Sequence, residues 1–151
     1  MAKQIPDIKK TLALNLAKAR ARYGLSQDAL AKSSGIRRTY IALIEHPDGH
    51  NARFGTVEKL ARGLGCDARI LLGVRVTSTL DSTGPSLFKC FVMRSREARI
   101  AAGLSQEGLS ETAGFFRTYV GRMETTATDI SIKDAASIAD TLGMSLGRLL
   151  K

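Results

Sequence analysis

Apolar side chains recur at helical spacing along residues 11–72, and single glycines interrupt the pattern. A first helix is predicted to begin near Thr11, with its apolar positions at Leu12, Leu14, Leu16 and Ala19. Gly24 is expected to end this helix, because glycine adopts the left-handed conformation found at many helix ends. Four more helices are predicted over 27–33, 37–45, 57–64 and 68–72. They are delimited by further glycines and by capping residues, among them Ser26, Thr56 and Asp67.

The same pattern occurs a second time. Residues 24–45 and 103–124 align without a gap at an offset of 79, and 10 of the 22 aligned positions are identical. The identical residues are, in order, Gly, Leu, Ser, Gln, Leu, Gly, Arg, Thr, Tyr and Glu. Repetition over this length indicates a duplicated domain.

The second repeat predicts the same order of helices. Its helices are expected over 91–102, from Gln106 after the capping Ser105, and over 117–124, with Asp134 and Ser145 aligned to Thr56 and Asp67. The offset falls to 78 after Glu124, so one residue has been lost in a loop, where deletions are tolerated. We therefore expect an all-α protein of two tandem five-helix domains, with a tail at 1–10, domains at 11–72 and 90–151, and a linker at 73–89.

The second and third helices of each repeat have the features of a helix-turn-helix. Such helices cross at about 90–120° over a short turn. Gly35 and Gly114 supply a turn residue that tolerates positive φ, and Ala31 and Ser110 are small enough for the two helices to touch. The predicted core positions are Leu30, Ile36, Ile41 and Ile44 in the first repeat and Leu109, Phe115, Val120 and Met123 in the second.

Charge is distributed unequally between the repeats. The chain of 151 residues has a net charge of +9 and an isoelectric point near 10, which indicates a polyanionic partner. Residues 1–72 contain 13 basic and 6 acidic residues, whereas residues 91–151 contain 8 and 7. The first repeat therefore carries most of the attraction for a polyanion.

Several other classes of protein have no support in the sequence. No apolar run is long enough to span a membrane and no signal peptide is evident, so we expect a cytoplasmic, nucleoid-associated protein. Cys66 and Cys90 are expected to be free thiols, and His46 and His50 lie in a loop with Pro47 and Gly49 that does not suit metal binding. We expect no enzymatic activity, no metal, no cofactor and no small-molecule effector.

The doubled pattern Gly-Leu-Ser-Gln-(acidic)-x-Leu-x-x-x-x-Gly-x-x-Arg-Thr-Tyr resembles the lambda-repressor-like, Xre-type family of bacterial and phage regulators. The resemblance covers nearly the whole chain outside the tail and the linker. It implies a five-helix fold, a third helix that enters the major groove, and control of transcription. The expected recognition helices are 37–45 and 116–124.

The resemblance also implies which residues bind DNA. The glutamines that begin the second helices, Gln27 and Gln106, are expected to bind backbone phosphates. Tyr40 and Tyr119 would flank the backbone, and Arg53 represents the basic loop after the third helix, for which the second repeat has no cation. Base edges would be read by Arg37, Arg38, Thr39 and Leu43 in the first repeat and by Phe116, Arg117, Thr118 and Arg122 in the second.

Electrostatics supports this interpretation for the arginines. Arg37 and Arg38 lie at the positive end of a helix, where a cation is unfavourable by about 0.3–1 kcal/mol. Their placement is explained if a phosphate or a guanine edge binds there. Phe116 occupies the position equivalent to Arg37, and either contacts a thymine methyl group or packs on protein.

We therefore expect a sequence-specific regulator of transcription that binds an operator in double-stranded DNA, acts as a repressor and forms a homodimer. A single chain acting as a pseudo-dimer on an asymmetric site is the alternative to the homodimer. Two other functions stay open. In one, only the first domain binds DNA and the second is a dimerisation or partner-binding module. In the other, the protein is an antitoxin-type or antiactivator-type adaptor that binds protein.

Overall fold

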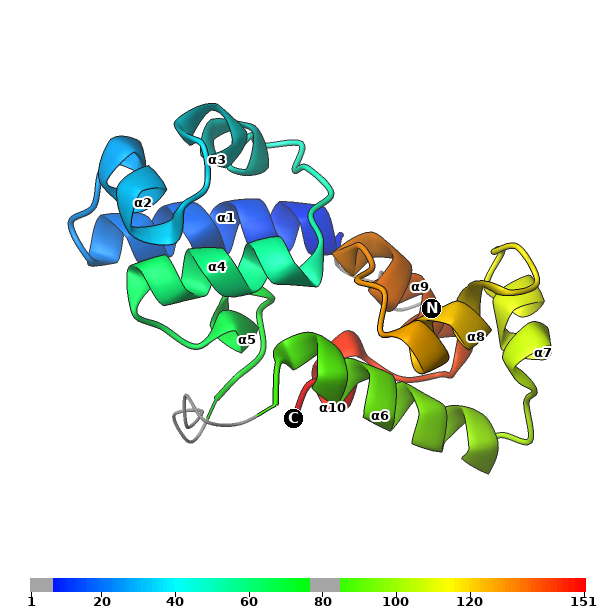
Figure 1. Cartoon of the computed structure of the whole chain (residues 1–151). Coiled ribbons are helices and arrows are strands. Elements are labelled where there is room, and N and C mark those ends of the chain that lie inside the picture. The colour runs from blue at the N-terminus through cyan, green and yellow to red at the C-terminus, as the bar shows by residue number, and fades with distance from the viewer. Residues whose placement is uncertain (1–6, 77–84) are drawn as a thin grey trace.

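The computed structural model describes residues 7–76 and 85–151, whose helices form two groups of five (Figure 1). The first group, which we call domain 1 (residues 8–72), contains α1 (Ile8–Arg22), α2 (Gln27–Ser34), α3 (Arg38–Ile44), α4 (Phe54–Leu64) and α5 (Ala68–Leu71). Domain 2 (residues 86–150) contains α6 (Leu87–Ala101), α7 (Gln106–Thr112), α8 (Tyr119–Thr126), α9 (Ile132–Thr141) and α10 (Leu146–Leu149). The expected all-α fold of two tandem five-helix domains is confirmed.

Local capping signals place several helix ends where the sequence predicts them. Ser26 and Ser105 accept hydrogen bonds from the third residue after each of them, and so cap α2 and α7. Ser145 caps the short helix α10 in the same way, and Asp67 caps α5 by accepting from the N–H of Arg69, the second residue after it. After α2 and α7 the chain turns through the left-handed conformation at Gly35 (φ 73°) and Gly114 (φ 84°), where a Cβ atom would introduce strain.

The first helix of each domain begins earlier than predicted. Asp7 caps α1, which starts at Ile8 rather than near Thr11, so Lys9 and Lys10 belong to the helix and not to a tail. Residues 1–6, the rest of the predicted tail, lie outside the described residues. Ser86 caps α6, which starts at Leu87 rather than near Phe91. Leu87 and Phe88, assigned to the linker from the sequence, are buried in the core of the protein, as is Val74.

The starts of three further helices also differ from the sequence prediction. The fourth helix α4 begins at Phe54 and not at Val57, and its counterpart α9 begins at Ile132 after the capping Ser131. The recognition helix α8 begins at Tyr119 and continues to Thr126, instead of covering 116–124. Residues 116–118 form a turn in front of it, in which the Tyr119 N–H donates to the carbonyl oxygen of Phe116.

Each helix-turn-helix is held by the apolar residues predicted for it. Leu30, Ile41 and Ile44 are fully buried in domain 1, as are Leu109, Val120 and Met123 in domain 2, whereas Ile36 and Phe115 are half-buried. Ser110, the small residue between α7 and α8, is also buried. Its hydroxyl donates to the Gln106 carbonyl oxygen and accepts from the Val120 N–H, which links the two helices directly.

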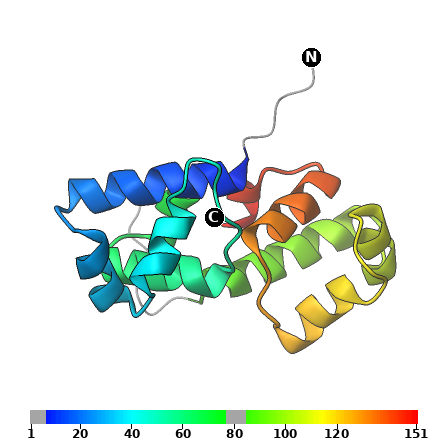
Figure 2. The same cartoon turned by 90° about the horizontal axis from the view of Figure 1, so that it is seen from above.

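The two domains pack against each other through α4 and α6 and through α1 and α9 (Figures 1 and 2). Phe54 at the start of α4 is fully buried, and its ring contacts the rings of Phe88 and Phe91 on α6 at centroid distances of 5.7 and 5.4 Å. Glu58 on α4 accepts a hydrogen bond from the Leu87 N–H at the start of α6. The apolar core is therefore continuous from one domain to the other.

The buried ring of Phe54 gives a test of this shared core. Phe54→Ala should lower the free energy of unfolding of the whole chain by about 3–5 kcal/mol, because it removes contacts that both domains make. Urea denaturation measures the change. Phe116→Ala is the matched control: that ring is 57% exposed, so its loss should cost no more than about 0.5 kcal/mol. A similar small cost for both variants would show that the domains do not share a core.

Candidate nucleic-acid interface

A hydrogen-bonded group of three side chains fixes the position of α3 in domain 1. Arg20 on α1 forms a bidentate ion pair with Glu45, just after α3, at 2.8 and 3.0 Å. Its third nitrogen donates to the carbonyl oxygen of Leu25. Gln27, the first residue of α2, donates to the same Glu45 carboxylate at 3.0 Å. This group therefore links the first three helices, and we call it the Arg–Glu–Gln clamp.

Domain 2 repeats the clamp with equivalent residues. Arg99 pairs with Glu124 at 2.9 and 3.0 Å and donates to the Leu104 carbonyl oxygen, while Gln106 donates to Glu124 at 2.7 Å. Both glutamates are largely buried, with 8% and 4% of their side chains exposed. No role was predicted from the sequence for Arg20, Glu45 or their counterparts. The repeat did contain a signal for these residues, since the arginine and the glutamate of the clamp both recur at the offset of 79.

The outward face of α3 brings together the side chains that the sequence predicts for base reading. Arg37, Arg38, Thr39 and Leu43 are all exposed, whereas Ile41 and Ile44 on the opposite face are buried. No side chain caps α3 at Arg37. Arg38 is 62% exposed and lies 3.3 Å from Asp28 on α2, so a surface ion pair holds its guanidinium beside the helix. Leu43 is 47% exposed and adds an apolar contact to this face.

The corresponding face of domain 2 has the same position in the fold but different chemistry. Arg117 pairs with Glu107 of α7 at 2.8 Å, as Arg38 does with Asp28, and this contact raises the pKa of its guanidinium. Arg122 lies over the Phe116 ring at 5.7 Å, and Phe116 also meets Tyr119 edge to face. Phe116 thus packs on its own domain and still presents more than half of its surface to solvent.

The two tyrosines at the recognition helices have different partners. Tyr119 stacks on Phe115 and donates its hydroxyl to Asp134 on α9 at 2.7 Å. Burial and the carboxylate of Asp134 raise the pKa of Tyr119 well above its ordinary value, so it remains a hydrogen-bond donor. Tyr40 meets the His50 ring edge to face instead, and Thr56 occupies the position equivalent to Asp134.

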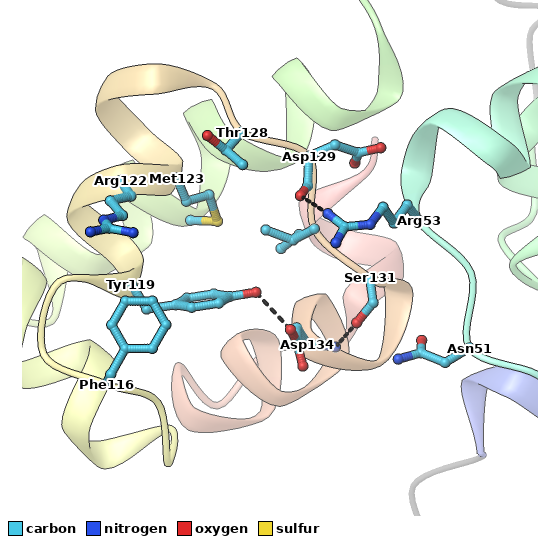
Figure 3. Close-up of a pocket in the computed structure, with 11 residues that line it drawn as sticks. Asn51, Arg53, Phe116, Tyr119, Arg122, Met123, Thr128, Asp129, Ser131 and Asp134 are labelled. Atoms are coloured by element: carbon cyan, nitrogen blue, oxygen red, sulfur yellow. Dashed lines mark hydrogen bonds between the residues drawn. The ribbon is translucent and has the colours of Figure 1, made fainter.

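Arg53 lies at the contact between the domains rather than beside α3. Its Nη1 atom donates to the carbonyl oxygen of Asp129 at 2.6 Å, and it lines a pocket of about 440 Å³ with residues of α8 and α9 (Figure 3). Figure 3 shows Arg53 and Asn51 reaching this pocket from domain 1, while Phe116, Tyr119 and Arg122 face it from domain 2. Asp129 and Asn51 were not singled out from the sequence.

Potential metal ligands, thiols and apolar helices were the other features considered from the sequence. Within residues 7–76 and 85–151, no three His, Cys, Asp or Glu side chains lie close enough together to hold a metal ion. Cys66 and Cys90 are free, and burial raises the pKa of the Cys66 thiol. Among the described helices, none is both long and apolar enough to cross a membrane.

Comparisons with known proteins agree with this geometry. A family model described as "Helix-turn-helix" matches residues 16–71, and one described as "Helix-turn-helix domain" matches residues 93–150. A protein of Neisseria meningitidis serogroup B (strain ATCC BAA-335 / MC58), named "Neisseria hypothetical transcription factor", is 36% identical over 66 residues. The match covers 44% of this chain and 61% of that protein, less than two thirds of its length. No solved structure matches the chain with significance.

The fold is that of two helix-turn-helix domains, each with one face of its recognition helix exposed. Together, the two family matches and this relative support an Xre-like helix-turn-helix regulator that carries two such domains in tandem. These families consist typically of regulators without enzymatic activity.

The clamp in domain 2 can be tested through its buried charge. Glu124→Ala leaves Arg99 almost buried and without its carboxylate, which should lower the free energy of unfolding by about 3 kcal/mol. Thermal or urea denaturation of the full chain measures this loss. Glu97→Ala, on the exposed side of α6, removes an equal charge and should change stability by no more than about 0.5 kcal/mol. If the two variants unfolded alike, the clamp would not be what positions α8.

Proposed function

We propose that the chain binds operators in double-stranded DNA sequence-specifically and represses transcription by occupying a promoter. The observation that carries this proposal is the contrast between the two faces of α3. Its inner face is completely buried, whereas Arg37, Arg38, Thr39 and Leu43 are exposed on its outer face. A helix of this kind supplies base contacts when it enters the major groove. A protein of this kind acts where the DNA is, at the nucleoid in the cytoplasm.

The exposed side chains suit the edges of base pairs. An arginine that donates two hydrogen bonds to O6 and N7 of guanine makes the commonest specific contact, and we give this role to Arg38. Asp28 holds the guanidinium near the outer face and would release it when guanine binds. Leu43 provides an apolar surface for a thymine methyl group, and Thr39 a hydroxyl for either a base or a phosphate.

Gln27 and Gln106 are proposed to position the protein on the backbone. Each uses its amide nitrogen on the clamp glutamate, which fixes the side chain while the second N–H of the amide remains for a phosphate oxygen. Arg53 donates to Asp129 through one of its five N–H groups, so a phosphate contact remains compatible with its position. Such contacts set register and carry no sequence information.

Domain 2 has a second candidate role, as a dimerisation or partner-binding module. Two of its proposed DNA-binding side chains are engaged within the domain, since Arg122 covers Phe116 and Tyr119 donates to Asp134. The low net charge of the domain favours the same interpretation. DNA binding through α8 requires that Arg117 and Arg122 contribute to affinity.

Arg38 can be tested as a base-reading residue in the full chain. On a site selected from random DNA, Arg38→Ala should weaken binding by about 1–3 kcal/mol and relax the preference at one base pair. Arg62→Ala, an exposed arginine on α4, should reduce affinity only slightly and leave sequence preference unchanged. Gel shifts on the selected and random sites measure both effects. An equal loss on both kinds of DNA would make Arg38 a phosphate contact.

The contribution of domain 2 can be tested through salt dependence. The logarithm of affinity falls with the logarithm of salt concentration, with a slope of about −0.9 per neutralised phosphate. If α8 binds DNA, replacing Arg117 and Arg122 by Ala in the full chain should make this slope shallower by about one to two units. Arg94→Ala with Arg96→Ala, on the exposed side of α6, is the control for charge. An unchanged slope would favour the partner-binding role of domain 2.

A further inference from the structure

The two loops that precede α4 and α9 meet in a reciprocal contact. We call residues 45–53 the α3–α4 loop and residues 127–131 the α8–α9 loop. The Phe54 N–H donates to the Ile130 carbonyl oxygen at 3.2 Å, and the Ile132 N–H donates to the Ala52 carbonyl oxygen at 2.8 Å. Arg53 and Ser131 thus form an isolated antiparallel bridge between the domains.

Two side chains, one from each loop, add a second reciprocal pair of hydrogen bonds. Asp129 accepts from the Gly55 N–H in the first turn of α4 at 2.9 Å. Asn51 accepts from the Lys133 N–H in the first turn of α9 at 3.2 Å. Each loop therefore caps the helix of the other domain. The contact matters most for α4, because no side chain of its own domain caps it at Arg53, whereas Ser131 caps α9 locally.

These four hydrogen bonds form two pairs, and within each pair the duplication relates one bond to the other. The bond from Arg53 to Asp129 is an addition without a counterpart among the described contacts. Residue 51 corresponds to 129, 52 to 130, 54 to 132 and 55 to 133, all at the offset of 78 found in this part of the repeat. When residue i of one unit contacts residue j of the other, and residue j of the first contacts residue i of the second, the units are related by a two-fold axis. The domains have this relation in the loop contact, which is the arrangement of a symmetric dimer within one chain.

Covalent linkage favours this internal pairing over pairing between chains. Two modules joined by a short connection meet at an effective concentration of about millimolar. A second chain at micromolar concentration would compete for the same loops at a disadvantage of roughly a thousandfold. The loop surfaces that could pair with a second copy are thus already used within the chain.

Resting on the proposed function, we propose that one chain alone presents α3 and α8 to DNA in a fixed arrangement, as an internal dimer. It then reads a single site made of two unequal half-sites at a set spacing. The half-sites differ because Arg37 and Leu43 on one head correspond to Phe116 and Arg122 on the other. This is the alternative to the homodimer that the sequence left open.

The internal contact is tested first in the protein without DNA. Sedimentation at micromolar concentration should give a monomer, and the Gly55 and Lys133 amides should exchange with deuterium at least about tenfold more slowly than unprotected amides. Replacing both Asn51 and Asp129 by Ala should remove this protection. Asp48→Ala should retain it, since the Asp48 side chain is 86% exposed and lies beside His46 of its own loop. A stable dimer, or unprotected amides in the original chain, would overturn the proposal.

The arrangement on DNA is tested with a site selected from a random pool. One chain should bind per duplex, and inserting five base pairs between the half-sites, about half a helical turn, should weaken binding roughly a hundredfold. Two chains on a palindromic site, or indifference to the insertion, would overturn the internal dimer while leaving the proposed function intact. If a monomer with protected amides selected no DNA sequence, the proposed function itself would fail, and the reading of half-sites with it.

Discussion

Unpaired N–H groups at the start of a helix need acceptors, and in this protein that requirement connects the two domains. The first turn of α4 has no capping side chain from domain 1, so Asp129 and the Ile130 carbonyl oxygen of domain 2 serve instead. A negative charge at this end of a helix is also favoured by the helix dipole. Phe54 follows at once and buries its ring against α6, so hydrogen bonding and apolar burial act at the same point of contact.

Each recognition helix is also held by contacts within its own domain. The Arg–Glu–Gln clamp ties the end of the helix to the first and second helices of its own domain, so all of its side chains come from one domain. The loop after the helix then continues into the contact between domains. The orientation of α3 and α8 within each domain is thus set locally, while their relation to each other is set by the contact between the domains, which includes the two loops and the packing of α4 on α6 and of α1 on α9.

Sequence signals that act over a few residues predicted the fold well. Capping by Ser26, Ser105 and Asp67 and the turn at Gly35 need only their neighbours, and all are found where expected. The start of α4 was misplaced at Val57 because its cap, Asp129, lies 74 residues away from Gly55. The early starts of α1 and α6 were missed for a different reason. Asp7 and Ser86 were overlooked as caps in stretches that were taken for a tail and a linker.

The candidate site was predictable only in part. The helical period predicts which residues of α3 are exposed on its outer face. It does not predict which side chains from other helices or loops form hydrogen bonds with the candidate site residues. The sequence did not indicate that Tyr119 would donate to Asp134, or that Arg53 would turn toward domain 2. Glu45 and Glu124 were visible as repeated residues, but their role depends on Arg20 and Arg99, which the fold brings to them from 25 residues away.

Because the two domains are encoded separately within one chain, substitutions can change the outer face of one recognition helix without changing the other. In a homodimer every change in a recognition helix occurs in both heads, so both half-sites must change together. In a tandem chain the inner residues and the clamp can stay the same while the outer residues diverge, as Arg37 and Phe116 have done. The charge of domain 1 can then supply most of the attraction to phosphates, and the nearly neutral domain 2 needs only to be held in place. A fixed contact between the heads is what makes such a division of roles effective, because a weak second head adds affinity only when it is already positioned.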